Sequence, residues 1–415
     1  MNSSLITIVV VILGLYSAWT IGANDVANAM GTSVGSKAIT FKKAIVLAAI
    51  FELAGALFVG NAVTGTIAKG IVSPEVSSDL PVFIIGMISA LLGSALWVHI
   101  ASRLGLPVST SHSIVGAVLG FGVIRCGFGS VNWHEVLRIA ASWVISPLAG
   151  AIISFLLFTF LLRRVIATKN SVAEVKKVAP YLVFVVIVIL VLSMVYKGLP
   201  SLHLDMPLHI ALLWSSLAGI VAALIARVWI LRIQCSEDAS FAHKMRHTEK
   251  VFAILQLMTA CYVAFAHGAN DVANAIGPVA AVQEALKYGK LQETVAIPFS
   301  TLAIGGVGIV AGLAMYGRFV MKTIGEGIMH LQPSRGFAAE FGCATSVLVC
   351  SKLGLPVSTT HCIIGAVIGV GLARGGGAIN LRIVKSIFAS WIWTIPFAAG
   401  LTLIIYPIAK YIFLR

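Results

Sequence analysis

The sequence predicts an all-α, polytopic membrane protein with about 12 transmembrane helices in two inverted five-helix repeats that contain interrupted helices. Three observations support this fold class. Of the 415 residues, 59% are hydrophobic and only 11% are charged, whereas soluble domains carry about 25% charged residues. Apolar runs long enough for a spanning helix recur without the strand-period alternation of a barrel. Two motifs each occur twice, which indicates an internal duplication.

The first repeat is expected to comprise residues 1–162 and the second residues 251–415. Hydropathy places spans of the first repeat near residues 4–30, 44–62, 81–102, 107–124 and 134–162. It places spans of the second repeat near residues 251–276, 294–316, 337–351, 356–373 and 384–413. The linking region, residues 163–250, adds apolar runs at 181–196 and 208–230 and is expected to form a helical hairpin.

Basic residues orient the spans. The two flanks of the linking hairpin, residues 163–177 and 227–250, each hold five Lys or Arg, and residues 198–207 hold none. Both flanks are therefore expected to be cytoplasmic. An odd number of spans per repeat then inverts the second repeat and places both termini outside the cytoplasm. Because the net charge of +14 resides in such loops, the expected partner is the lipid bilayer of a cell inner or plasma membrane and not nucleic acid.

The decapeptide GANDVANAMG at residues 22–31 recurs as GANDVANAIG at residues 268–277. Its polar residues are spaced three and four apart, so one helical turn brings them together. Carboxylate and amide oxygens without His or Cys suit a hard cation such as sodium. The flanking glycines are expected to break the helix and free backbone carbonyls; an Asn/Asp capping motif is the alternative. The expected cation ligands are Asn24, Asp25, Asn28, Asn270, Asp271 and Asn274.

A second motif, LGLPVSTSHSIVGAVLGFG at residues 104–122, matches residues 353–371 at 14 of 19 positions. Its proline is expected to start a helix whose first turn presents hydroxyls and backbone N–H groups to an oxyanion. Ordinary N-capping and helix packing are the alternative. For His112 and His361, orientation or packing is favoured over direct contact or proton transfer. The expected phosphate ligands are Ser109, Thr110, Ser111, Ser358, Thr359 and Thr360.

Two further acids, Glu52 and Glu340, fall within expected spans and are not repeat mates, because Pro298 and Leu91 occupy the corresponding positions. Intramembrane carboxylates indicate function, so these two are expected to couple cation occupancy to movement or to bind another cation. A structural hydrogen bond is the alternative. The acids also constrain the mechanism: an anion about 6 Å from one carboxylate is repelled by roughly 3 kcal/mol at an effective dielectric constant near 20. Bound cations, or protons, would reverse that repulsion, which is the basis of symport.

The twin GANDVANA and twin GLPVST[ST]H motifs resemble those of the inorganic phosphate transporter family, over nearly the whole chain apart from residues 163–250. The resemblance implies a twelve-helix carrier of orthophosphate, driven by sodium or in some bacterial members by protons, and often dimeric. It also implies that Asp25, Asp271, Glu52 and Glu340 are critical for transport and that the Ser/Thr runs after Pro107 and Pro356 meet phosphate. Some bacterial relatives carry sulfate.

The expected function is therefore uptake of inorganic phosphate by cation-coupled, sodium-favoured symport with alternating access; a proton-coupled phosphate or sulfate permease is the alternative. Sodium is expected as a co-substrate, with no cofactor, and a homodimer is possible. A passive channel is disfavoured by the acid-lined site. An enzyme is disfavoured because the sequence shows no pattern of nucleophile and base. The six cysteines lack CxxC spacing and are expected to be buried hydrophobes, not metal ligands or disulfides.

Overall fold

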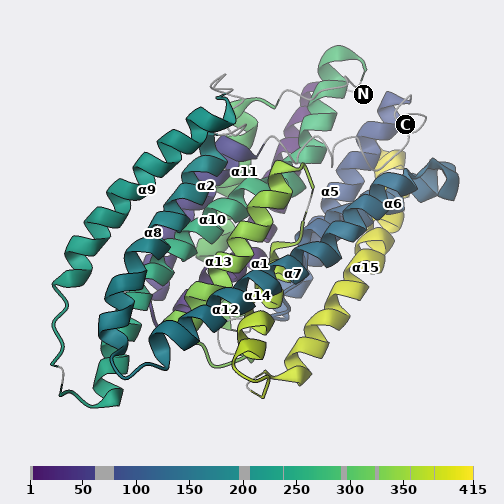
Figure 1. Cartoon of the computed structure of the whole chain (residues 1–415). Coiled ribbons are helices and arrows are strands. Elements are labelled where there is room, and N and C mark those ends of the chain that lie inside the picture. The colour runs from purple at the N-terminus through teal and green to yellow at the C-terminus, as the bar shows by residue number, and fades with distance from the viewer. Residues whose placement is uncertain are drawn as a thin grey trace.

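The computed structural model describes residues 3–60, 79–195, 206–236, 238–290, 297–322, 327–355, 357–377 and 379–414. Within these ranges the regular secondary structure is helical (Figure 1). A few expected span ends, at residues 61–62, 196, 294–296 and 356, lie outside the described residues. The all-α prediction is confirmed.

Twelve helices of fifteen or more residues lie in the described ranges and match the expected segments one to one. The first repeat contributes α1 (Ser3–Gly35), α2 (Phe41–Val59), α5 (Leu80–Arg103), α6 (Thr110–Cys126) and α7 (Trp133–Leu161). The linking region contributes α8 (Ser171–Val195) and α9 (Leu208–Leu231). The second repeat contributes α10 (Phe241–Tyr288), α11 (Phe299–Tyr316), α13 (Pro333–Lys352), α14 (Thr359–Ala373) and α15 (Leu381–Phe413). Eight helices in the described residues are long and apolar enough to cross a membrane.

The predicted helix breaks at the decapeptide glycines are wrong, because α1 and α10 run continuously through both copies. Gly22 and Gly268 instead permit close helix crossings. A Cβ at Gly22 would lie 1.8 Å from the carbonyl oxygen of Ile309 on α11, and one at Gly268 would lie 2.1 Å from that of Glu52 on α2. Each decapeptide helix therefore packs directly against a helix of the other repeat.

The interruptions lie between α5 and α6 and between α13 and α14, and each connection ends on buried residues, Val108 and Val357, although Leu104 and Leu353 are exposed. Asn24, in the interior of α1, hydrogen-bonds Ser102 and Leu106 of the first connection. It lies 21 residues from the start of α1 and 11 from its end, which is about 32 Å and about 17 Å along the axis. Each of these helix pairs therefore turns back inside the molecule as a hairpin. A hairpin that enters and leaves on the same side of the membrane adds no net crossing. Each repeat therefore crosses the membrane three times, which is still an odd number, as the inverted arrangement of the repeats requires.

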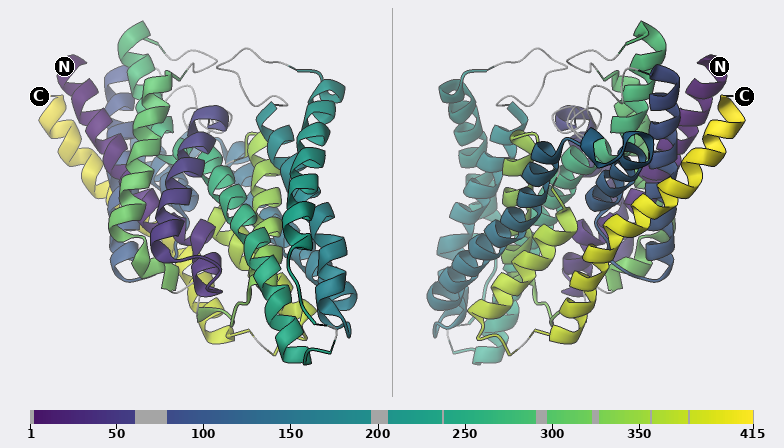
Figure 2. Two further views of the ribbon diagram at one scale, coloured as in Figure 1. Left: turned by 90° about the vertical axis from the view of Figure 1, so that its left-hand side faces the viewer. Right: turned by 90° about the vertical axis from the view of Figure 1, so that its right-hand side faces the viewer.

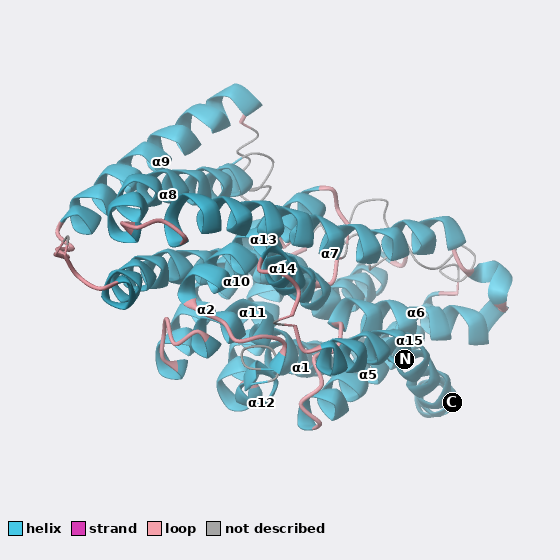
Figure 3. Ribbon diagram, turned by 60° about the horizontal axis from the view of Figure 1, so that its bottom comes forward, coloured by secondary structure: helices cyan, strands magenta, loops and turns pink. Residues whose placement is uncertain are grey.

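The linking helices lie at one side of this core, where α8 packs against α10. α8 and α9 pack on each other along one side of the molecule, with α9 at its edge (Figures 1 and 3). The N- and C-termini lie together at the same end (Figure 2). α1, α10, α13 and α14 lie between the linking helices and α15, and α5 and α6 pack beside α15 (Figure 1).

The prediction that the cysteines are buried is correct for Cys261, Cys343, Cys350 and Cys362. It is wrong for Cys235, which is half-buried in the connection between α9 and α10. The side chain of Cys126 lies outside the described residues.

Gly22→Ala is expected to destabilise the protein by about 2 kcal/mol or more, because the added methyl group must displace a backbone carbonyl and not a flexible side chain. The measurement is the thermal unfolding midpoint in detergent. Gly400→Ala is the matched control, since its helix α15 offers nothing within 4 Å of the new Cβ. Equal midpoints for the two variants would contradict the close crossing of α1 and α11.

Candidate functional site

The first asparagine of each decapeptide holds the hairpin connection of its own repeat. Asn24 Nδ2 donates to Ser102 Oγ at 2.9 Å and to the Leu106 carbonyl at 3.0 Å, and its Oδ1 accepts from Val108 N at 3.2 Å. Asn270 does the same in the second repeat. Its Nδ2 donates to the Val357 carbonyl at 2.8 Å, and its Oδ1 accepts from Ser351 Oγ at 3.3 Å. The expected cation ligands Asn24 and Asn270 are thus engaged in fixing the hairpin tips.

The last asparagine of each decapeptide reaches across to the hairpin of the other repeat. Asn28 Nδ2 donates to Thr360 Oγ1 at 2.8 Å and lies 3.4 Å from Thr359 Oγ1. Asn274 Nδ2 donates to Ser111 Oγ at 3.1 Å and Thr110 Oγ1 at 3.2 Å. These contacts are reciprocal, so the two repeats build a single site at their interface.

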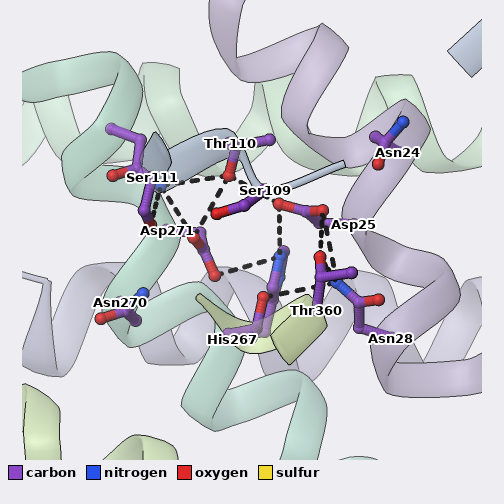
Figure 4. Close-up of polar contacts among 12 residues, drawn as sticks. Asn24, Asp25, Asn28, Ser109, Thr110, Ser111, His267, Asn270, Asp271 and Thr360 are labelled. Atoms are coloured by element: carbon purple, nitrogen blue, oxygen red, sulfur yellow. Dashed lines mark hydrogen bonds and ion pairs between the residues drawn. The ribbon is translucent and has the colours of Figure 1, made fainter. Parts of the chain in front are cut away.

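Asp25 and Asp271 lie where the two hairpin tips meet (Figure 4). Thr110 Oγ1 lies 2.6 Å from Asp25 Oδ2 and 3.4 Å from Asp271 Oδ1, so one hydroxyl spans both carboxylates. Thr360 Oγ1 lies 3.1 Å from Asp25 Oδ1. The tips also touch directly, since Ser111 Oγ donates to the Val357 carbonyl at 2.9 Å. The residues expected to bind a cation and those expected to bind phosphate belong to two separate sequence motifs, whereas the structure places them in direct contact.

Ser109 and Ser358 differ from the other hydroxyls of their motif. Ser109 Oγ accepts from His112 N and Ser358 Oγ from His361 N, both at 3.2 Å, so each serine caps its helix. The prediction that Pro107 starts the first of these helices is wrong, because α6 begins at Thr110 after the Ser109 cap. Pro356 lies outside the described residues. The caps leave the first-turn hydroxyls of Thr110, Ser111, Thr359 and Thr360 beside the acids.

Two buried amide oxygens of the site, Asn28 Oδ1 and Asn274 Oδ1, have no hydrogen-bond partner among the described residues. Both side chains are at most 1% exposed. An unpartnered buried acceptor is costly, and amide and carboxylate oxygens are ligands of hard cations. The two amide oxygens occupy equivalent positions in the two repeats, so each repeat brings one buried acceptor that could bind a cation.

His267, which belongs to neither duplicated motif, lies at the centre of the acids. Its Nδ1 is 2.9 Å from Glu52 Oε2, and its Nε2 is 3.3 Å from Asp271 Oδ2 and 4.0 Å from Asp25 Oδ2. Asp25, His267 and Asp271 together could hold a metal ion by geometry. The premise of an oxygen-only cluster is therefore wrong. Comparison of the repeats does not identify His267, because Ile21 occupies the equivalent position. Its position one helical turn before Asp271, however, indicates that the two side chains lie close together.

Glu340 lies in a separate, fully buried polar pocket between α1, α10 and α13. Its Oε1 accepts from Thr32 Oγ1 and Ser33 Oγ, both at 2.6 Å, and from Gln256 Nε2 at 3.1 Å. Its Oε2 accepts from Thr259 Oγ1 at 2.7 Å. This pocket has no polar counterpart in the other repeat, where the equivalent positions include the apolar core residues Val10, Leu91 and Val279. The two repeats therefore differ in this region, because the second repeat contains a buried carboxylate where the first contains apolar side chains.

His112 and His361 pack in a row of four aromatic rings. The His112 ring lies 3.7 Å from that of Trp143 and 4.4 Å from that of His361, and the His361 ring lies 3.5 Å from that of Trp391. Trp143 and Trp391 belong to α7 and α15. This arrangement supports the packing interpretation, in which the histidines brace the first turns of α6 and α14 across the repeat interface.

Comparison with known proteins agrees with this geometry. A model described as the phosphate transporter family matches residues 21–402. A provisionally named phosphate permease of Pyrococcus horikoshii is 45% identical over 404 residues, which is 97% of both chains. The chloroplastic inorganic phosphate transporter 2-1 of Arabidopsis thaliana is 40% identical over 432 residues, covering 97% of this chain and 72% of the relative.

A solved structure of a sodium-dependent phosphate transporter superposes with a TM-score of 0.91 at 40% sequence identity, over 98% of this chain and all of the other. The matched relatives are permeases and transporters, not enzymes. The family resemblance carried by the twin motifs is thereby confirmed: this chain belongs to the phosphate transporter family.

Proposed function

We propose that this protein takes up inorganic phosphate by sodium-coupled symport with alternating access. The observation that carries the proposal is the matched pair of unpartnered amide oxygens, Asn28 Oδ1 and Asn274 Oδ1, beside two buried aspartates. Sodium is a hard cation that such oxygens bind. The name of the similar solved structure, a sodium-dependent phosphate transporter, supports the same choice of cation.

In the proposed cycle, cations bind first. Asp25 with Asn28 and Asp271 with Asn274 supply the direct cation ligands, while Asn24 and Asn270 hold the surrounding backbone in place. Cation charge then offsets the repulsion between the carboxylates and an incoming anion. Phosphate then binds at the first turns of α6 and α14. There the hydroxyl groups of Thr110, Ser111, Thr359 and Thr360 donate hydrogen bonds to it, and the helix N-termini carry a partial positive charge. Ser109 and Ser358 contribute by capping these turns.

Alternating access is proposed to separate and rejoin the hairpin tips. The tips touch through Ser111 and Val357 and through Thr360 and Val108, and each is fixed to its own decapeptide helix by Asn24 or Asn270. Movement of one repeat against the other would therefore open the site on one side at a time. The proposed division is into residues 1–162, 163–250 and 251–415, with α8 and α9 outside the moving interface.

The protein is proposed to lie in a cell inner or plasma membrane with both termini outside the cytoplasm. The shared end of the two termini in Figure 2 is compatible with this orientation, and the basic flanks of the linking hairpin favour it. The family resemblance implies a homodimer. Cross-linking of the protein in native membranes, with a dimer band expected at low cross-linker concentration, tests that part.

The decisive experiment is radiolabelled phosphate uptake into proteoliposomes under an imposed inward sodium or proton gradient, with excess sulfate as competitor. Accumulation above equilibrium is expected with the sodium gradient and is expected to resist sulfate. Accumulation driven only by the proton gradient would mean that protons and not sodium drive transport. Loss of phosphate uptake in excess sulfate would mean that the site does not select phosphate over sulfate. Uptake that never exceeds equilibrium under either gradient would rule out symport.

Glu340 is proposed to bind a further cation or to couple its occupancy to movement. Glu340→Gln is expected to lower sodium-driven uptake at least about tenfold, because four donors surround Glu340 and a neutral amide loses about 1.5–3 kcal/mol of charged hydrogen bonding. The sodium concentration for half-maximal uptake is expected to rise. Glu174→Gln is the control, since that acid is partly exposed and pairs with Lys177. An unchanged sodium dependence in Glu340→Gln would exclude this role.

A further inference from the structure

The connection between α9 and α10 brings together three side chains that the transport mechanism does not use. Cys235 lies in the connection, and His243 and His247 lie on the first turns of α10. One potential ligand atom from each of the three lies within 4.8 Å of the others. Among the cysteines whose burial is described, Cys235 is the one that is not fully buried.

The two histidines already have the spacing of a metal chelate. They are four residues apart on one helix, the spacing by which a helix presents two imidazoles to one zinc ion. Their Nε2 atoms are 3.1 Å apart. Two ligands of a tetrahedral zinc ion, each bound at about 2.0–2.1 Å, lie about 3.3 Å from one another. The pair is therefore close to the geometry that zinc requires.

The local fold supports the position of these residues. Ser240 caps α10 by accepting from His243 N at 3.4 Å, which fixes the helix start one turn before His247. Cys235 lies three residues after the C-cap of α9, Arg232. Its sulfur lies within 4.8 Å of the imidazole nitrogens, and a sulfur and a nitrogen bound to the same zinc ion lie about 3.6 Å apart, so a shift of at most about 1.2 Å suffices. A loop residue permits such a shift.

We propose that Cys235, His243 and His247 form a zinc site. One thiolate and two neutral imidazoles are the ligands that zinc favours, and a water molecule would complete the tetrahedron. The bound ion would tie the end of α9 to the start of α10, the continuous helix that carries His267 and Asp271 further along. This inference is independent of phosphate transport, because it concerns residues outside the transport site.

The test is metal binding by the purified full-length chain, with any affinity tag removed and bound metal stripped by a chelator. Zinc affinity is measured by competition with a chromophoric chelator. We expect one zinc ion per chain in the unsubstituted protein and a loss of at least about 100-fold in affinity for both Cys235→Ser and His247→Ala, since even outer-shell changes cost up to about 100-fold. His134→Ala, which removes an exposed histidine at the start of α7, is expected to bind zinc normally.

Cobalt(II) provides a second readout, because a thiolate ligand adds a charge-transfer band in the near ultraviolet and tetrahedral geometry gives strong visible bands. Both signals are expected in the unsubstituted protein, and Cys235→Ser is expected to lose the charge-transfer band. The variants are expected to keep phosphate uptake in metal-free buffer, which verifies that they fold. No zinc bound by the unsubstituted chain, or an affinity in Cys235→Ser and His247→Ala equal to that of the unsubstituted chain, would overturn the proposal.

Discussion

Asp25→Asn and Asp271→Asn are each expected to reduce sodium-driven phosphate uptake at least about 100-fold while the protein still inserts and folds. Each change removes a buried negative charge that is proposed to bind a cation, and loss of one charge-assisted contact costs up to about 3 kcal/mol. At Asp25 the cost is compounded, because both carboxylate oxygens face hydroxyls, Thr110 and Thr360. An amide presents an N–H group to one of these hydroxyls and can accept from only one.

The measurement is initial uptake into proteoliposomes at saturating sodium, normalised to the amount of folded protein. Asp238→Asn is the matched control, since Asp238 is exposed in the α9–α10 connection, and its uptake is expected to equal that of the unsubstituted protein. If Asp25→Asn and Asp271→Asn both transported at the unsubstituted rate, the cation-site assignment would have to be abandoned.

His267→Ile is expected to cause the second largest effect, by leaving the buried Glu52 carboxylate without its charged neighbour. Glu52 and His267 are at most 1% exposed, and the Glu52 carboxylate is paired with His267 Nδ1, which lies 2.9 Å from Oε2. Removing one member of such a pair costs about 3–5 kcal/mol. The thermal unfolding midpoint in detergent is therefore expected to fall sharply, and uptake is expected to be lost.

The repeat-related positions supply the control for this prediction, because Ile21 in the first repeat is equivalent to His267 and Pro298 in the second repeat is equivalent to Glu52. The double variant His267→Ile with Glu52→Leu copies that apolar character and is expected to recover most of the lost stability, although not transport. A double variant less stable than His267→Ile alone would contradict the account of Glu52 as a charge that His267 compensates.

Much of the fold was predictable from the sequence because lipid solubility limits the choices. The apolar runs could form only helices or a barrel, and the duplicated motifs identified the equivalent helices. The same duplication identified the acids and hydroxyls around Asp25 and Asp271, since polar groups repeated in both halves converge at the repeat interface.

The features that the sequence analysis misses or misplaces depend on contacts between repeats. Gly22 resembles a helix breaker in a sequence, and only the position of the Ile309 carbonyl shows that it is a packing glycine. Hydropathy cannot distinguish a spanning helix from one arm of a buried hairpin, because both are apolar over a similar length. His267 is invisible to a comparison of repeats, because asymmetric residues are what that comparison discards.

That asymmetry itself bears on transport. The Glu340 pocket and the pair of Glu52 and His267 occur once each, whereas the decapeptide and hydroxyl residues occur twice. A fully symmetric site would meet the two sides of the membrane in the same way. The single-copy acids give the two repeats different polar surroundings beside the site, whereas the gradients of the transported ions set the direction of net transport.

The central claim is that the buried aspartates admit phosphate only after cations have offset their charge. Equilibrium binding of radiolabelled phosphate to the purified protein, with sodium titrated against choline at constant ionic strength and alkaline pH, tests it most directly. The account predicts that phosphate affinity rises at least about tenfold as sodium saturates, which corresponds to a coupling free energy of about 1.4 kcal/mol or more. Phosphate affinity that is the same in sodium and in choline would contradict it.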